Sequence, residues 1–156
     1  MHVKRRGVSA GRNAALRRAR GDIIAFIDAD YVLSEKVFNE VIKTFGKRED
    51  IVALEPSLRL YERDIPERRR LFKIITRIKN VIKRVSFLTP WPWAFSCVFC
   101  RGSAVSKIGF FSNKLSYSDD LKYYQKLRKL GRFVLLKATA ERSYRRPAES
   151  GLFRTM

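Results

Sequence analysis

Two aspartates, Asp28 and Asp30, stand at the end of a continuous apolar run, Ile23–Ile27. A run of this kind predicts a strand buried on both faces, and open α/β sheets bind their ligands at the carboxyl ends of strands. With only a small residue between them, the two carboxylates can converge on Mg²⁺ or Mn²⁺. These ions prefer oxygen ligands and often hold a diphosphate through one or two protein carboxylates. The plainer interpretation of the same pattern is a solvated turn or a helix cap.

A second acidic pair, Asp119 and Asp120, opens a helical pattern that runs to Leu130. The helix dipole and the free N–H groups of the first turn favour anions at this position. A carboxylate that is fixed at a helix start and faces a cleft can take a proton from an attacking hydroxyl, as a general base does. Simple capping of the helix is the alternative interpretation.

Three arginines, Arg12, Arg145 and Arg146, are candidates for stabilising a phosphate that leaves as an anion. The whole chain is strongly basic, with 34 Lys and Arg against 15 Asp and Glu and a net charge of +19. Such a charge attracts nucleic acid, anionic lipid headgroups or diphosphates, and it does not choose among them. Each arginine can therefore also be interpreted as a solvated surface charge.

Length and composition predict one folded domain over residues 1–156. Hydrophobic residues make up 46% of the chain and aromatic residues 12%, which argues against disorder despite the charge. Zinc takes four ligands and the only histidine is His2, so we expect Cys97 and Cys100 to be buried thiols in a strand. The longest uncharged stretch is too short to span a membrane. We expect a cytoplasmic protein that is either soluble or attached to the inner face of the cell membrane.

Helical and strand-like patterns alternate along the chain, which predicts an α/β or α+β layer fold. Helices are expected over 13–20, 35–45, 65–85, 103–108 and 119–130. Strands are expected over 23–27, 51–60, 93–100 and 133–136. The tail from Ala138 is expected to be irregular or weakly extended.

One of these helices is basic and amphipathic. Its apolar residues, at helical spacing, are Leu71, Ile74, Ile75, Ile78, Val81, Ile82 and Val85. A helix of this composition can lie on an anionic membrane, with Trp91 and Trp93 at the level of the headgroups. An ordinary helix that covers a sheet has the same apolar stripe, so both interpretations stay open.

Four segments, in this order along the chain, resemble family 2 glycosyltransferases. They are Gly7–Asn13 with Ala19–Asp30, Lys107–Phe111, Asp119–Asp120, and Ser143–Arg146 with Gly151–Thr155. The first is similar to the family's stretch from an Arg-Asn pair to a D-x-D motif, and the third is similar to its Glu-Asp pair. Two departures are Asp119 in place of the glutamate and Phe110 in place of the second glycine before a phenylalanine.

The resemblance implies an α/β fold of the GT-A type, with a mixed sheet flanked by helices. The family's first β-α-β-α-β region has no counterpart here, so an N-terminally truncated catalytic portion is expected.

The resemblance also implies metal-dependent, inverting transfer of a sugar from a nucleotide-diphosphate sugar to an acceptor, which is lipid-linked in many members or else a glycan. Site roles carry over as follows. Asp30, together with Asp28, binds the divalent metal, and Asp28 also lies near the ribose. Asp120 is the catalytic base beside Asp119. The substrate-binding residues are Arg12, Asn13, Asp28, Arg145 and Arg146.

Two other functions compete with sugar transfer. A nucleic-acid-binding module would explain the charge, but no recognisable nucleic-acid-binding motif accompanies it, so we do not expect nucleic acid as a partner. A membrane-surface module without catalysis would explain the amphipathic helix. Metal-dependent binding of a nucleoside diphosphate would distinguish the enzyme from both.

Overall fold

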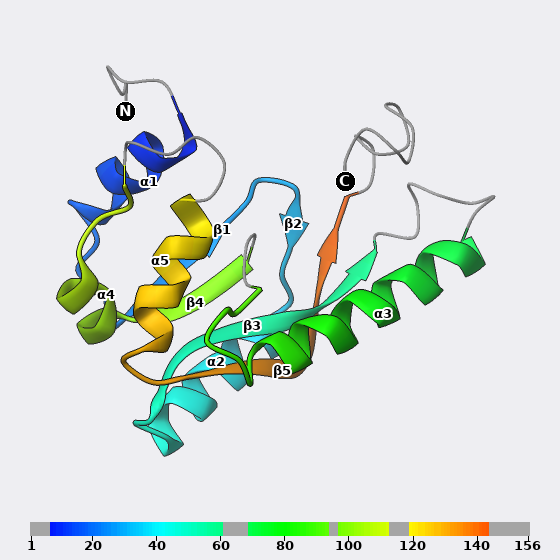
Figure 1. Cartoon of the computed structure of the whole chain (residues 1–156). Helices are drawn as coiled ribbons and strands as arrows, with labels where there is room; N and C mark the ends of the chain where they lie inside the picture. Colours follow the sequence, from blue (N-terminus) through cyan, green and yellow to red (C-terminus); the bar gives the residue numbers. More distant parts are fainter. Residues whose placement is uncertain (1–6, 61–68, 94–96, 113–118, 144–156) are drawn as a thin grey trace.

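The computed structural model describes residues 7–60, 69–93, 97–112 and 119–143 (Figure 1). These residues form five helices: α1 (Val8–Leu16), α2 (Glu35–Lys47), α3 (Arg69–Ser86), α4 (Gly102–Ile108) and α5 (Asp119–Arg128). They also form five strands: β1 (Ile23–Ile27), β2 (Tyr31–Val32), β3 (Ile51–Leu60), β4 (Cys97–Arg101) and β5 (Arg132–Arg142). No helix in this described part of the chain is long and apolar enough to cross a membrane.

The strands form one mixed sheet in the order β1-β4-β3-β5-β2. The central pair β3 and β5 is parallel, while β4 runs antiparallel to both of its neighbours, β1 and β3. Strands β1, β3 and β5 therefore point the same way, and β1 and β5 deliver their last residues to the same end of the sheet. The predicted α/β architecture, a mixed sheet flanked by helices, is confirmed.

The two faces of the sheet carry separate apolar clusters, and β4 contributes alternate residues to each. Val98 and Cys100 pack with α4 and α5 on one face, whereas Cys97 and Phe99 pack with α2 on the other. Figure 1 shows α2 on the opposite side of the sheet from α5. Both cysteines are buried and free, as predicted, and burial raises the pKa of the Cys97 and Cys100 thiols.

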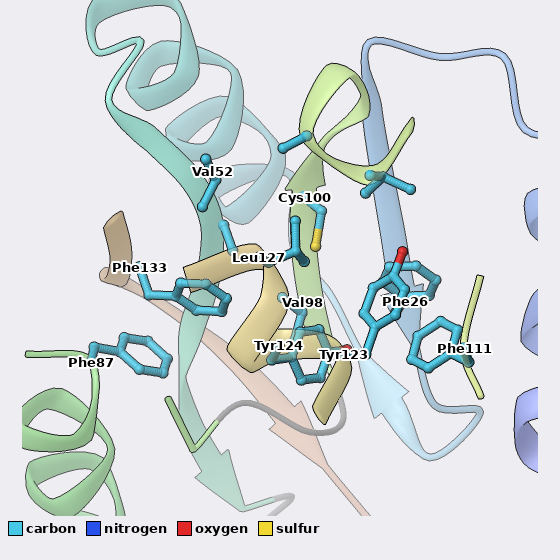
Figure 2. Packing of buried hydrophobic residues seen from close by; sticks show 13 residues of the cluster. Phe26, Val52, Phe87, Val98, Cys100, Phe111, Tyr123, Tyr124, Leu127 and Phe133 are labelled. Atoms are coloured by element: carbon cyan, nitrogen blue, oxygen red, sulfur yellow. The ribbon is translucent and has the colours of Figure 1, made fainter. Parts of the chain in front are cut away.

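Aromatic rings fill the first of these clusters. Figure 2 shows Phe26 of β1, Phe111 and Tyr123 of α5 gathered at one end of it. The rings of Phe111 and Tyr123 are stacked with centroids 3.7 Å apart, and Phe26 meets both of them edge-on. This packing places the start of α5 beside the end of β1.

The prediction that β1 is buried on both faces is wrong. Only Phe26 is buried, whereas Ala25 and Ile27 are exposed. The reason is the position of β1 at an edge of the sheet, where α1 lies beside it across a cavity of about 400 Å³. An apolar run alone does not distinguish a central strand from one at the edge of a sheet.

Strand β5 is longer than predicted, because it does not end at Leu136 but continues to Arg142. Its second half pairs with β3 from Thr139 onward, and its end pairs with the short strand β2, which was not predicted. The pairing of β3 with β5 shifts in register at Pro56, because proline has no N–H to donate to the neighbouring strand. Of the two predictions for the tail from Ala138, irregular or weakly extended, the extended one holds up to Arg142, where the tail is a paired strand.

A buried acid lies in the middle of the sheet. Glu55 of β3 is only 2% exposed and forms an ion pair with Lys83 of α3. Burial raises the pKa of Glu55 to about 7, although the charge and hydrogen bond of Lys83 oppose the rise. Because an unfolded glutamate titrates near ~4.3, the folded state binds this proton more tightly than the unfolded state.

We therefore predict that Glu55 makes stability fall as the pH rises from about 4.5 to about 7. The contribution is complete below the unfolded pKa and is lost as the pH rises through the folded pKa. The Glu55→Gln variant should flatten this part of the curve of unfolding free energy against pH, measured by urea denaturation. The exposed Glu49→Gln variant removes the same charge and should retain the wild-type slope. Equal slopes for all three proteins would contradict the prediction.

Candidate functional site

Arg12 links the two acidic segments that the sequence singled out. Its guanidinium forms an ion pair with Asp120 at the start of α5, and its Nη2 lies 3.4 Å from Oδ1 of Asp28 at the end of β1. The Arg12 side chain is largely buried, with 14% exposure, and lies over the ring of Phe111 at 5.5 Å from its centroid. Two carboxylates that are far apart in the sequence thus share one cation.

Asn13 explains why Arg12 is held at this point. Its buried side-chain amide donates to the carbonyl oxygen of Phe111 at 2.9 Å and accepts from the N–H of Phe111 at 2.8 Å. These two bonds fix the segment after α4 against α1. The resemblance assigned Asn13 to the substrate, and that role stays a prediction; in the structure its amide bonds to the backbone of Phe111.

Asp30 is held by the end of β5. Nε of Arg142, the last residue of β5, donates to Oδ2 of Asp30 at 2.9 Å, and the N–H of Ser143 donates to the Asp30 carbonyl oxygen at 2.9 Å. Burial lowers the pKa of Arg142, but the hydrogen bond of Asp30 and the electrostatic interactions with Tyr31, Asp30 and Asp28 together raise it overall. Asp30 therefore faces a permanently charged partner.

Arg142 was not singled out from the sequence, which pointed to Arg145 and Arg146 instead. Those two residues lie outside the described part of the chain. The available signal was the alternation of Leu136, Ala138 and Ala140 with polar residues, which is typical of a strand and places Arg142 on the same face. Alanine is a weak strand former, so the pattern was easily missed.

The acidic residues after β1 offer oxygen atoms suited to a hard cation. Oδ1 of Asp30 is buried and has no hydrogen-bond partner among the described residues, and the Asp28 side chain is 42% exposed. Within the described ranges, no group of three or more His, Cys, Asp or Glu side chains could hold a metal ion. The donors thus fit Mg²⁺ or Mn²⁺ only with further oxygen ligands from a bound phosphate or water, which is how Mg²⁺ is often held.

The backbone of Asp119 opens α5, but its side chain lies outside what the structure describes. Asp120 is 28% exposed and lies on the first turn of α5, where a carboxylate is favoured by the helix dipole. Arg12 gives Asp120 a fixed direction, and the remaining exposure leaves it accessible to a ligand. The arrangement can therefore present one carboxylate to a hydroxyl close to the acidic end of β1.

A known protein family matches about the first two thirds of the chain. The sequence model of "Glycosyl transferase family 2" matches residues 1–108. A stretch of 47 residues is 43% identical to the "Uncharacterized glycosyltransferase YfnE" of Bacillus subtilis (strain 168). The stretch makes up 30% of this chain and 12% of that relative, so the chain matches only a small part of the relative's length. The family match includes Arg12, Asn13 and the pair after β1, whereas Asp120 lies beyond it.

We predict that Asn13→Ala destabilises the fold by about 1–3 kcal/mol, because it leaves the buried N–H and carbonyl of Phe111 without partners. Asn39→Ala is the matched control, since this exposed helix residue forms only a 3.4 Å contact with Glu35. It should change the unfolding free energy by no more than about 0.5 kcal/mol. Chemical denaturation of both variants measures the difference, and equal effects would show that the Asn13–Phe111 bonds do not hold α1 in place.

Proposed function

This chain belongs to glycosyl transferase family 2, and we propose that its acidic site transfers a sugar from a nucleotide-diphosphate sugar to a hydroxyl of an acceptor. Family membership supports glycosyltransferase activity in general. One observation carries the more specific proposal: a single guanidinium, that of Arg12, contacts both Asp28 and Asp120. The proposed reaction needs one acidic group for the diphosphate and its metal and another for the acceptor hydroxyl. The contact with Arg12 brings the segment after β1 and the start of α5, which carry these two groups, close together.

In this proposal the end of β1 receives the donor's diphosphate. Asp30 and Asp28 would hold Mg²⁺ or Mn²⁺, which, when bound, neutralises the negative charge of the leaving diphosphate. Arg142 fixes Asp30 by its hydrogen bond at 2.9 Å, and the second oxygen of Asp30 is buried without a hydrogen-bond partner among the described residues. Asp28 would also lie near the ribose. Arg145 and Arg146 would add positive charge near the diphosphate.

Asp120 is the proposed catalytic base. The acceptor hydroxyl gives its proton to the Asp120 carboxylate while its oxygen forms a bond with the anomeric carbon. The bond from that carbon to the diphosphate breaks, and the electron pair leaves with the diphosphate. In the inverting reaction that we propose, Asp120 of α5 would act on the side of attack and the diphosphate would leave from the opposite side, near the end of β1, which inverts the configuration of the sugar. The ion pair with Arg12 orients Asp120, and Asp119 would lie beside it.

The acceptor proposed for this site is lipid-linked or a glycan. A lipid-linked acceptor would place the protein in the cytoplasm at the inner face of the cell membrane. Support for a membrane contact comes from another part of the molecule, the helix α3, described below.

We predict that nucleoside diphosphates bind to the chain only in the presence of Mn²⁺ or Mg²⁺. The Asp30→Asn variant, which keeps the size of the side chain, should weaken this metal-dependent binding about tenfold or more, as a loss of ~1.4 kcal/mol would. Titration calorimetry with a panel of nucleoside diphosphates, each with and without metal, measures the effect.

Asp50→Asn is the matched control, because Asp50 is a paired surface carboxylate bound to Arg48, remote in the sequence from both acidic segments. It should bind like the wild type. Binding that is indifferent to metal, or equally affected by both substitutions, would overturn the proposed diphosphate site. Binding of nucleic acid that falls steeply with salt and ignores metal would instead favour the nucleic-acid module.

A further inference from the structure

Helix α3 presents its polar side to the sheet. Asn80 accepts a hydrogen bond from the N–H of Leu58 and donates one to its carbonyl oxygen, both at 2.9 Å. Thr76 is buried, and Lys83 reaches the buried Glu55. Thr76, Asn80 and Lys83 are spaced by four and three residues, so they lie on one face of the helix. This polar face binds α3 to β3.

The apolar side of α3 consequently faces away from the protein. Six apolar residues are between 42% and 62% exposed: Leu71, Ile74, Ile78, Val81, Ile82 and Val85. The interpretation of this stripe as an ordinary sheet-covering face is therefore wrong. A helix normally buries its apolar stripe, and a large exposed apolar patch marks an interaction site.

The segment after α3 extends the apolar surface with two indole rings. Trp91 is 64% exposed and Trp93 is 49% exposed, and Leu88 before them is 76% exposed. Thr89 fixes this turn by hydrogen bonds to the backbone of Ser86 and Trp91. Tryptophan is typical of the interface between lipid and water, where its ring is partly apolar and its N–H can meet a polar partner.

Cations flank the apolar stripe. Residues 69–93 contain no Asp or Glu. The exposed side chains on α3 include Arg70, Lys73, Arg77 and Arg84. A second copy of this chain docked on the stripe would bring the same cations against one another, which disfavours self-association. An anionic surface, by contrast, complements the cations while the apolar residues enter its acyl region.

We propose that α3 and the segment through Trp93 form a membrane-binding surface, with α3 lying in the plane of an anionic lipid bilayer. This proposal is independent of the sugar transfer proposed above, because none of its residues belongs to the acidic site. It names the partner by its chemistry: a bilayer interface with negatively charged headgroups. A neutral bilayer has no negative charge to attract the cations of α3, and a soluble polyanion has no apolar layer to receive its apolar residues.

The experiment compares vesicles of phosphatidylcholine alone with vesicles that also contain phosphatidylglycerol. The chain has two tryptophans, and both lie on the proposed surface, so their emission reports directly on its environment. We expect co-sedimentation with the anionic vesicles only, together with a blue shift of the tryptophan emission. The Ile78→Gln/Val85→Gln variant should bind the anionic vesicles at least about tenfold more weakly, with the shift lost.

The matched control is Ile42→Gln on α2, which removes an apolar side chain of similar exposure from another surface: Ile42 is 62% exposed, Ile78 52% and Val85 57%. It should bind like the wild type. All three proteins should show the same circular dichroism, because the substituted residues are exposed.

Three outcomes would overturn the proposal. Equal vesicle binding by the wild type and the double variant would mean that net charge alone attracts lipid. A wild-type dimer that the double variant converts to a monomer, without a change in vesicle binding, would identify a second copy as the occupant. An emission shift with a nucleic acid and none with vesicles would assign the surface to that polyanion.

Discussion

The arrangement of the site depends on the contact of one arginine with two carboxylates. Without Arg12, the end of β1 and the start of α5 would each present an aspartate to the other, and like charges at short range repel. The guanidinium removes this repulsion and fixes the direction of both side chains. Asn13, the next residue, binds the backbone of Phe111, and Phe111 stacks on Tyr123 of α5. Arg12 and Asn13 of α1 thus hold together the end of β1, the segment after α4 and the start of α5.

Polar contacts play a similar role where α3 meets the sheet. Strand β4 pairs with β3 at Ala53 and Leu54, and further along β3 the amide of Asn80 satisfies the backbone of Leu58 as a neighbouring strand would. Because these polar contacts hold the helix, its apolar residues are left for another partner. Local amphipathicity alone could not show this, since the same stripe would suit either face.

Much of the fold could be predicted from the sequence. Strand β3 has the predicted bounds, and each predicted helix overlaps an observed one, because these elements have recognisable periodicity. Helix α1 differs most, since it begins five residues earlier and ends four residues earlier than the predicted helix over 13–20. The exposure of β1 and the length of β5 could not be predicted, since both depend on which strands pair. At the site, the residue types and the order of Asp28, Asp30 and Asp120 along the chain were enough to predict the two acidic segments. The contact of Arg142 with Asp30 depends on the end of a weakly patterned strand, and the contacts of Asn13 depend on tertiary packing.

The most direct test of the central claim is a double-mutant cycle between Arg12→Gln and Asp120→Asn, measured as unfolding free energies in urea. Residues in direct contact show coupling energies of about 0.5–3 kcal/mol, whereas distant ones add within about 0.5 kcal/mol. We expect coupling in that range for this pair, and additivity for Arg12→Gln combined with Asp50→Asn. Additive effects of Arg12→Gln and Asp120→Asn would show that the two acidic segments do not share this arginine, and would contradict the site as described.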